Sequence, residues 1–285
     1  MKTRVLIDTD IGGDVDDAIA LALALSSPEI SVAGISLVYL GNAWRHGILS
    51  NMLEVYGRKD IPVAIGAEKP LIGSWGQSGD TEAERSGASP VFIDERNRAA
   101  EFIIRLCEDD PELTLVPIGP LTNLAAAMLA APRIAKGRRI MLMGGSPGDG
   151  RAEWNFLCDP EAAVTVLNSG AAVSIVGLNV TELCRFTQAE VDSFAHGGKK
   201  ERLLYEMMRD FTREHYLPVL HDPLAVGALL WDDVIAFEKK RVSVELCDRS
   251  RRGALTETEN GAEVRIATEV NPELFRKRLI ETVKE

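Results

Sequence analysis

Five aspartates fall within ten residues near the start of the chain, between a short apolar run and a longer apolar stretch. The apolar run covers residues 5–7 and the apolar stretch covers residues 18–25. A strand that ends in acids and leads into a buried helix is typical of an α/β protein, in which ligands bind at the carboxyl ends of the strands. The acids are Asp8, Asp10, Asp14, Asp16 and Asp17.

Several kinds of site could in principle explain these acids. Helix capping accounts for one or two of them but not for five. An EF-hand loop counted from Asp8 places Gly13 correctly at position six but has Ile19 where a glutamate is needed. A dinucleotide-binding GxGxxG sequence is absent. The remaining interpretation is a hard cation such as calcium, which several carboxylate and carbonyl oxygens bind together.

Strand-like apolar runs alternate with helical patterns along most of the chain. This alternation predicts an α/β fold with a mainly parallel sheet, helices on both faces, and one domain over residues 1–285. The expected strands are residues 5–8, 32–38, 62–65, 113–117, 139–143, 172–176, 241–246 and 262–266. The expected helices are residues 15–26, 43–56, 95–107, 121–129, 160–168 and 272–283, with further helix between 188 and 230.

Polar side chains follow several of these strands and are expected to meet at one edge of the sheet. They include acids, amides and a hydroxyl, a combination that packing alone does not require. The residues are Asp10, Asn42, Thr122, Asn123, Glu153, Asn155 and Asn179.

A second informative stretch is LPVLHDPLAVGALL. His221 and Asp222 stand just before Pro223, a residue that is common in the first turn of a helix. A histidine beside an aspartate at a helix start is a candidate for acid–base chemistry, although a lone histidine is often structural.

Composition narrows the class of partner. Acidic residues outnumber basic ones by 43 to 32, which gives a formal net charge of −11. This balance argues against nucleic acid and against an anionic membrane surface. No signal peptide or membrane-spanning segment is evident, and the four cysteines lack CxxC spacing, so reduced thiols and a cytoplasmic location are expected.

Five ordered motifs resemble the inosine–uridine nucleoside hydrolase family over nearly the whole chain. They are DTDIGGDVDDAIAL, the Gly41-Asn42 pair, GPLTNLA, MGGS followed by AEWN and DPEAA, and LHDPLAV. The resemblance implies a Rossmann-like nucleoside hydrolase fold and hydrolysis of a ribonucleoside to free base and ribose. It also implies a Ca²⁺ cofactor, a role in purine or pyrimidine salvage, and a homodimer or homotetramer.

The resemblance also implies roles for single residues. The calcium ligands would be Asp10, Asp17, the backbone carbonyl of Thr122, and Asp222. Asp10 would also act as the base on the metal-bound water, and His221 would protonate the leaving base. Ribose hydroxyls would be held by Asp16, Asn42, Glu153 and Asn155.

The chain departs from the common pattern of that family in three places, one of which is the short segment between MGGS and AEWN, where an expected sugar-binding Asn is missing. The first motif is DxDxGGDVDD, two residues longer than the usual DxDxGxDD. The roles above are anchored on Asp16 and Asp17, which leaves Asp14 without an assigned role and as the alternative to them. The glycine-rich loop at residues 73–89 lacks the histidine of many relatives and is expected to close over the substrate. Candidates to line the base pocket are Trp44, His46, Trp75 and Trp154, although ordinary packing is the favoured interpretation of each.

Two other classes of protein remain open at this point. A haloacid-dehalogenase-type phosphatase would use Asp8 as nucleophile and Asp10 as acid, but Gly12 stands where that motif has Thr or Val. It would also leave LHDPLAV unexplained. A non-catalytic riboside-binding protein on the same fold is the other alternative, and release of free ribose distinguishes it from an enzyme.

Overall fold

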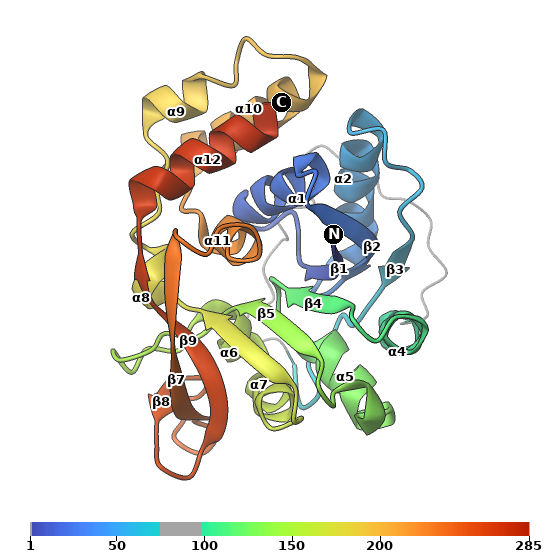
Figure 1. Cartoon of the computed structure of the whole chain (residues 1–285), viewed down its shortest axis with the longest axis vertical. Coiled ribbons are helices and arrows are strands. Elements are labelled where there is room, and N and C mark those ends of the chain that lie inside the picture. Colours follow the sequence, from blue (N-terminus) through green and yellow to red (C-terminus); the bar gives the residue numbers. More distant parts are fainter. Residues whose placement is uncertain (1, 75–97, 285) are drawn as a thin grey trace.

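The computed structural model describes residues 2–74 and 98–284, and within them nine strands form one sheet in the order β3-β2-β1-β4-β5-β6-β9-β7-β8 (Figure 1). Strand β7 runs antiparallel to β8 and β9, and the other neighbouring pairs are parallel. The strands are β1 (Thr3–Thr9), β2 (Ile30–Leu37), β3 (Val63–Ile65), β4 (Thr114–Pro117), β5 (Arg139–Met143), β6 (Ala172–Val176), β7 (Ile235–Val244), β8 (Leu255–Glu257) and β9 (Ala262–Val270).

Helices cover both faces of this sheet. Figure 1 shows α1, α2 and α11 on one side, with α10 and α12 outside them, and α4, α5 and α7 on the other side. The helices are α1 (Asp16–Ser26), α2 (Asn42–Val55), α4 (Ala99–Asp109), α5 (Thr122–Ala130), the 3₁₀ helix η1 (Pro132–Ile134), α6 (Trp154–Cys158), α7 (Pro160–Leu167), α8 (Leu178–Thr181), α9 (Gln188–Asp192), α10 (Lys199–Glu214), α11 (His221–Gly227) and α12 (Pro272–Lys284).

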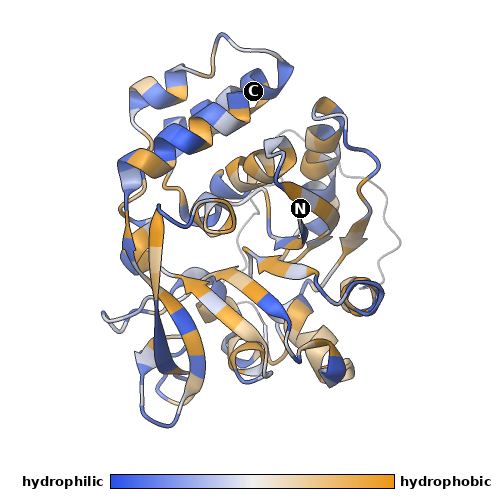
Figure 2. Cartoon of the chain, viewed as in Figure 1, coloured by the Kyte–Doolittle hydropathy of each residue, from blue (hydrophilic) through white to orange (hydrophobic). Residues whose placement is uncertain are grey.

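Strand β1 shows why both faces are covered. Its side chains alternate, so Val5 and Ile7 join the core beneath α1, α2 and α11, whereas Leu6 joins the core beneath α4, α5 and α7. All three are buried, and Figure 2 shows the central strands and α1 as mostly hydrophobic. A strand buried on both faces reads as a continuous apolar run, as residues 5–7 do.

The predicted fold class is confirmed, and most predicted elements are present. Strands β5 and β6 have the predicted bounds. The structure differs at β7, which begins at Ile235 rather than at residue 241, because its first half carries exposed charges on an outer strand of the sheet. The short elements β8, α6 and α8 were not predicted. The predicted start of α4 at residue 95 lies outside the described residues.

All four cysteines are free thiols; Cys107 and Cys184 are buried, Cys158 is half-buried and Cys247 is exposed. None of the described helices combines the length and apolar character needed to cross a bilayer.

The order of the strands also determines where a ligand can bind. From β1 the chain proceeds outward to β2 and β3, and from β4 it proceeds in the opposite direction to β5 and β6. The crevice between the carboxyl ends of β1 and β4 is therefore a topological switch point, where open α/β sheets bind their ligands.

Asn123, in the first turn of α5, holds this crevice together. Its side-chain amide donates to Asp8 Oδ1 at 2.8 Å and to the carbonyl of Leu37 at 2.9 Å. Its oxygen accepts from the backbone N–H of Ala67 at 2.9 Å. One buried side chain thus joins β1, β2 and the segment after β3.

We expect Asn123→Ala to lower the free energy of unfolding by about 2–4 kcal/mol, because each buried polar group left without a partner costs about 1–3 kcal/mol. Urea denaturation monitored by circular dichroism measures the change. Asn168→Ala is the matched control, since Asn168 also donates to a backbone carbonyl but is exposed. Equal stability of the two variants would contradict the role given to Asn123.

Candidate functional site

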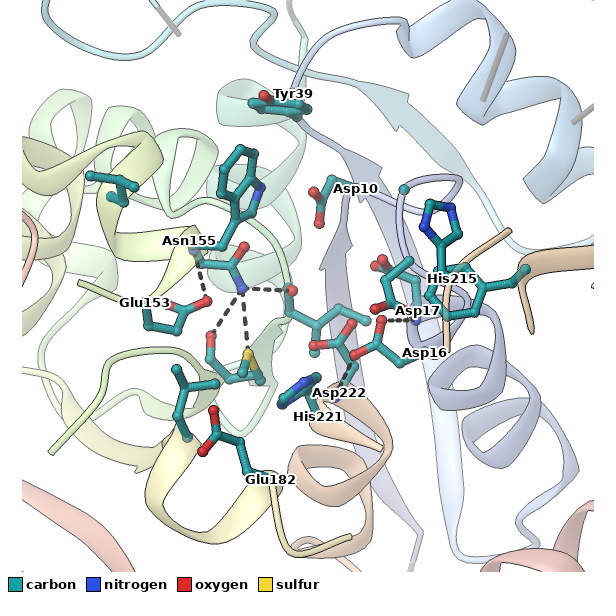
Figure 3. A pocket seen from close by; sticks show the side chains of 18 of the residues that line it. Asp10, Asp16, Asp17, Tyr39, Glu153, Asn155, Glu182, His215, His221 and Asp222 are labelled. Atoms are coloured by element: carbon teal, nitrogen blue, oxygen red, sulfur yellow. Dashed lines mark hydrogen bonds between the residues drawn. The ribbon is translucent and has the colours of Figure 1, made fainter. Parts of the chain in front are cut away.

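A cavity of about 770 Å³ opens at the predicted edge of the sheet (Figure 3). Residues at or just after the ends of five parallel strands line it, which places it at the switch point between β1 and β4. These residues are Asp10 after β1, Tyr39 after β2, Ile118 after β4, Met143 at the end of β5 and Leu178 after β6.

Three buried aspartates converge on one side of this cavity. Asp16 and Asp17 lie in the first turn of α1, and Asp222 lies in the first turn of α11, which packs beside α1. Each offers a carboxylate oxygen within 4.8 Å of the other two. Asp16 also accepts from the backbone N–H groups of Asp17 at 3.1 Å and Asp222 at 3.3 Å.

Burial raises the pKa of all three aspartates well above its usual range, and their mutual repulsion adds to the rise. The hydroxyl of Thr9 opposes this rise at Asp17 by donating to its carboxylate. Without a cation, these three carboxyl groups cannot all be ionised at once. Such a group suits a hard divalent cation, which prefers oxygen ligands. The three acids therefore fit such an ion.

Asp10 lines the same cavity but lies outside the group of three converging acids. Burial raises its pKa, and the nearby guanidinium of Arg45 opposes the rise. Arg45 is itself buried, and it donates to the carbonyls of Asp10, of Ile11 at 2.8 Å and of Leu40 at 2.7 Å. A buried positive charge thus lies near Asp10 at the cavity and holds the backbone of the loop that carries it.

Glu153 and Asn155 line the opposite side of the cavity (Figure 3). Both Glu153 oxygens accept backbone N–H groups, those of Gly145 at 2.9 Å, Asn155 at 2.8 Å and Phe156 at 3.2 Å, so Glu153 caps α6. Burial raises its pKa to about 7. The Asn155 amide donates to the carbonyl of Ile118 at 3.0 Å, which leaves its oxygen available to accept from a ligand hydroxyl.

His221 lies at the start of α11, and its ring lines the cavity next to Glu182. The Thr181 hydroxyl is 2.7 Å from His221 Nδ1 and fixes the ring. Burial lowers the pKa of His221 to about 4, although the carboxylate of Glu182 acts in the opposite direction. The ring is therefore neutral at pH 7 in the protein alone.

Two predicted site residues do not line the cavity. The Thr122 hydroxyl donates to Asp159 Oδ2 at 2.7 Å, and the cavity is lined instead by Ile118, which directly follows β4. The amide of Asn42 donates to the carbonyl of Gly66 at 3.1 Å, and its buried oxygen has no hydrogen-bond partner among residues 2–74 and 98–284.

Sequence reasoning missed four aromatic or imidazole side chains of the cavity: Tyr39, Phe211, His215 and Tyr216. Tyr39 has a φ of 78°, a left-handed conformation that is uncommon for a residue other than glycine and occurs often at functional sites. Phe211 and His215 are four residues apart at the end of α10, which is the spacing of one helix face. That spacing indicates that the two side chains share one face of the helix, but no nearby residue in the sequence indicates that this face lines the cavity.

The pocket-lining candidates had different outcomes. Trp154 lines the cavity and packs edge-to-face against Tyr39, with ring centroids 6.4 Å apart. Trp44 packs against the hydrophobic core, and His46 is 3.3 Å from the Ser50 hydroxyl. Trp75 and most of the loop at residues 73–89 lie outside the described residues.

Known proteins resemble this chain in sequence and in structure. A family profile described as inosine-uridine preferring nucleoside hydrolase matches residues 5–277. Uridine nucleosidase 1 of Arabidopsis thaliana is 32% identical over 85% of this chain and 78% of that protein. The pyrimidine-specific ribonucleoside hydrolase RihA of Salmonella paratyphi A is 34% identical over 89% of this chain and 88% of that protein.

Solved structures extend the comparison. The plant nucleoside hydrolase PpNRh1 superposes with a TM-score of 0.90 at 26% identity, covering 100% of this chain and 99% of that one. An inosine-guanosine nucleoside hydrolase superposes with a TM-score of 0.86 at 27% identity, covering 99% of each chain.

The buried acids predict that the metal-free protein loses stability as the pH rises. Burial raises the pKa of Asp8 and of Glu153 to about 7, from ordinary values of 3.8 and 4.5. A group whose pKa is higher in the folded state than in the unfolded state stabilises the fold, and this contribution is complete when the pH is below the unfolded-state pKa. That contribution is lost as the pH rises to the folded value, at about 1.4 kcal/mol per pH unit for each proton.

We therefore expect a lower Tm at pH 8 than at pH 5 in the presence of a chelator. Differential scanning calorimetry measures both values, and a divalent cation added at pH 8 should raise the Tm. A chelated protein that is equally or more stable at pH 8 would contradict this account of the acids.

Proposed function

Because the chain belongs to the inosine-uridine preferring nucleoside hydrolase family, it is a ribonucleoside hydrolase, and we propose that it uses calcium, with Asp10 as base and His221 as acid. The observation that carries the calcium proposal is the convergence of Asp16, Asp17 and Asp222 within 4.8 Å. Calcium accepts several carboxylates in irregular geometry, whereas magnesium demands a near-ideal octahedron.

The proposed ligands are the carboxylates of Asp10, Asp17 and Asp222 and a backbone carbonyl from the end of β4. Asp16 lies beside these ligands and is not counted among them. We assign that carbonyl to Ile118 rather than to Thr122, since Ile118 lines the cavity. When bound, calcium would lower the pKa of a coordinated water and orient the ribose hydroxyls.

The reaction breaks the bond between C1′ of the ribose and the base nitrogen. The bonding electrons leave with the base, so positive charge develops on the ribosyl group, as in glycoside hydrolysis. The buried carboxylates stabilise that charge. Water adds to C1′ and gives its proton to Asp10, while Asn155 accepts a hydrogen bond from a ribose hydroxyl. The departing base takes its proton from His221 after the ring has taken up a proton from solvent, and the carboxylate of Glu182 favours that charged form.

Two features bear on which substrate to test first. The relatives compared in sequence are named for uridine and for pyrimidine ribonucleosides, which makes uridine the first substrate to test. The cavity places the acids beside the aromatic rings of Tyr39, Trp154 and Tyr216, which suits a ribose joined to a planar base.

The phosphatase alternative conflicts with the position of Asp8. That residue is completely buried, and its carboxylate accepts from Ser36 and from Asn123 beneath the site. It is not among the residues that line the cavity, so it cannot act there as a nucleophile.

We expect the protein to release free ribose from uridine and to lose that activity after exhaustive chelation. Asp17→Ala should lower kcat/KM at least about a hundredfold, because metal stabilisation of the transition state is worth several kcal/mol. Asp60→Ala, which removes an exposed aspartate, is the control and should keep full activity. A reducing-sugar assay and elemental analysis test the proposal, and an active Asp17→Ala protein with full calcium would overturn it.

His221→Ala should lower the rate on uridine about a hundred- to ten-thousandfold, the usual contribution of a general acid. The variant should keep most of its activity on 4-nitrophenyl riboside, whose leaving group needs no proton. Parallel kinetics on the two substrates test the role. If both substrates lose the same factor, His221 positions Asp222 and does not donate the proton.

A further inference from the structure

Asp14 belongs to the lengthened first motif, and its contacts differ from those of its neighbours. It is not one of the three converging aspartates. Its Oδ1 accepts from the backbone N–H of Val15 at 2.6 Å, and its Oδ2 accepts from the Tyr216 hydroxyl at 3.1 Å. Both carboxylate oxygens thus already have protein partners. The second bond links residues 202 positions apart in the sequence.

Tyr216 belongs to a small cluster at the end of α10, together with Phe211 and His215. The Phe211 ring lies 4.8 Å from the His215 ring and 5.3 Å from the Tyr216 ring, measured between centroids. The Phe211 and Tyr216 rings meet at 88°, an edge-to-face contact. All three side chains line the cavity, so they form one aromatic wall, defined here as Phe211, His215 and Tyr216.

Phe211 packs against the hydrophobic core, whereas the other two members of the wall lie beyond the last turn of α10. His215 and Tyr216 are exposed, and the helix ends at Glu214. A surface segment with few buried contacts opens easily, and a hydrogen bond to a charged acceptor is stronger than a neutral one. The bond from Tyr216 to Asp14 therefore restrains the wall.

Asp14 connects this wall to the acids. It precedes Asp16 by two residues and Asp17 by three in the same loop. Figure 3 shows His215 on the side of Asp16 and Asp17, with Tyr39 across the cavity. If the acids bind ribose, the base attached to C1′ must occupy the neighbouring space, which the wall borders.

We propose that Asp14 is a positioning residue for base binding: by accepting the Tyr216 hydroxyl it holds the aromatic wall against the planar base of the substrate. The inference rests on the proposed function for the identity of the ligand. In this proposal, the two residues added to the motif provide a structural link between the acids and the base pocket. Asp14 neither binds the cation nor transfers a proton.

A double-mutant cycle in the full chain tests the link. Tyr216→Phe and Asp14→Ala should each raise KM for uridine about three- to tenfold, the size of one partly exposed hydrogen bond to a charge, with kcat largely kept. Because both changes break the same bond, the double variant should be no worse than the worse single variant. Asp14→Asn, which keeps an acceptor oxygen, should recover part of the loss.

Free ribose provides the readout that separates positioning from general damage. Its inhibition constant and the calcium concentration needed for activity should stay unchanged in all variants, because neither involves the base. Tyr205→Phe is the matched control, since it removes the hydroxyl of a half-buried tyrosine in α10, the helix that leads into the wall, and Tyr205 does not line the cavity. Additive effects on KM, or equal weakening of ribose inhibition, would overturn the proposal.

Hydrogen exchange of the substrate-free protein tests the same link without turnover. Amides of residues 211–217 should exchange faster in both single variants and to the same extent in the double variant, while those of α1 stay unchanged. Unchanged exchange at 211–217 would overturn the proposal even in an active enzyme. Absence of ribose release by the wild-type protein would instead contradict the proposed function.

Discussion

Carboxyl groups removed from water repel one another unless a proton or a cation lies among them. This constraint governs the edge of the sheet between β1 and β4. The packing of α1 beside α11 forces Asp16, Asp17 and Asp222 together, and burial raises the pKa of each. The buried guanidinium of Arg45 offsets part of the negative charge and at the same time holds the loop that carries Asp10. A divalent cation would neutralise the remaining negative charge.

The same constraint divides the cavity into two functional parts. Acids line one part, where they can neutralise a cation and a developing ribosyl charge, and aromatic rings border the part that receives the base. The substrate must span both parts for the C1′–N bond to lie at the acids. The Asp14–Tyr216 hydrogen bond links the loop that carries the acids to the aromatic wall. In the proposed function this bond would couple the cation site to the base pocket.

The sequence predicted the fold class and the acid side of the site, because both follow from local patterns. The strand at residues 5–8 with its following acids, and Asp222 beside Pro223, are short-range signals that place a side chain at a strand end or a helix start. The aromatic wall could not be predicted, since it depends on how the end of α10 packs near Asp14, which lies 202 positions from Tyr216 in the sequence. The assignment of the Thr122 carbonyl rested on a motif, and in the structure Ile118 rather than Thr122 lines the cavity.

The central claim is that the buried acids form one site for a divalent cation and hold protons in its absence. Calorimetric titration of the chelator-stripped protein with Ca²⁺ at pH 6, in two buffers of different ionisation enthalpy, tests it most directly. The account predicts one ion per chain and release of protons on binding, because raised pKa values leave the free acids partly protonated. Binding without proton release, or no saturable binding, would contradict it.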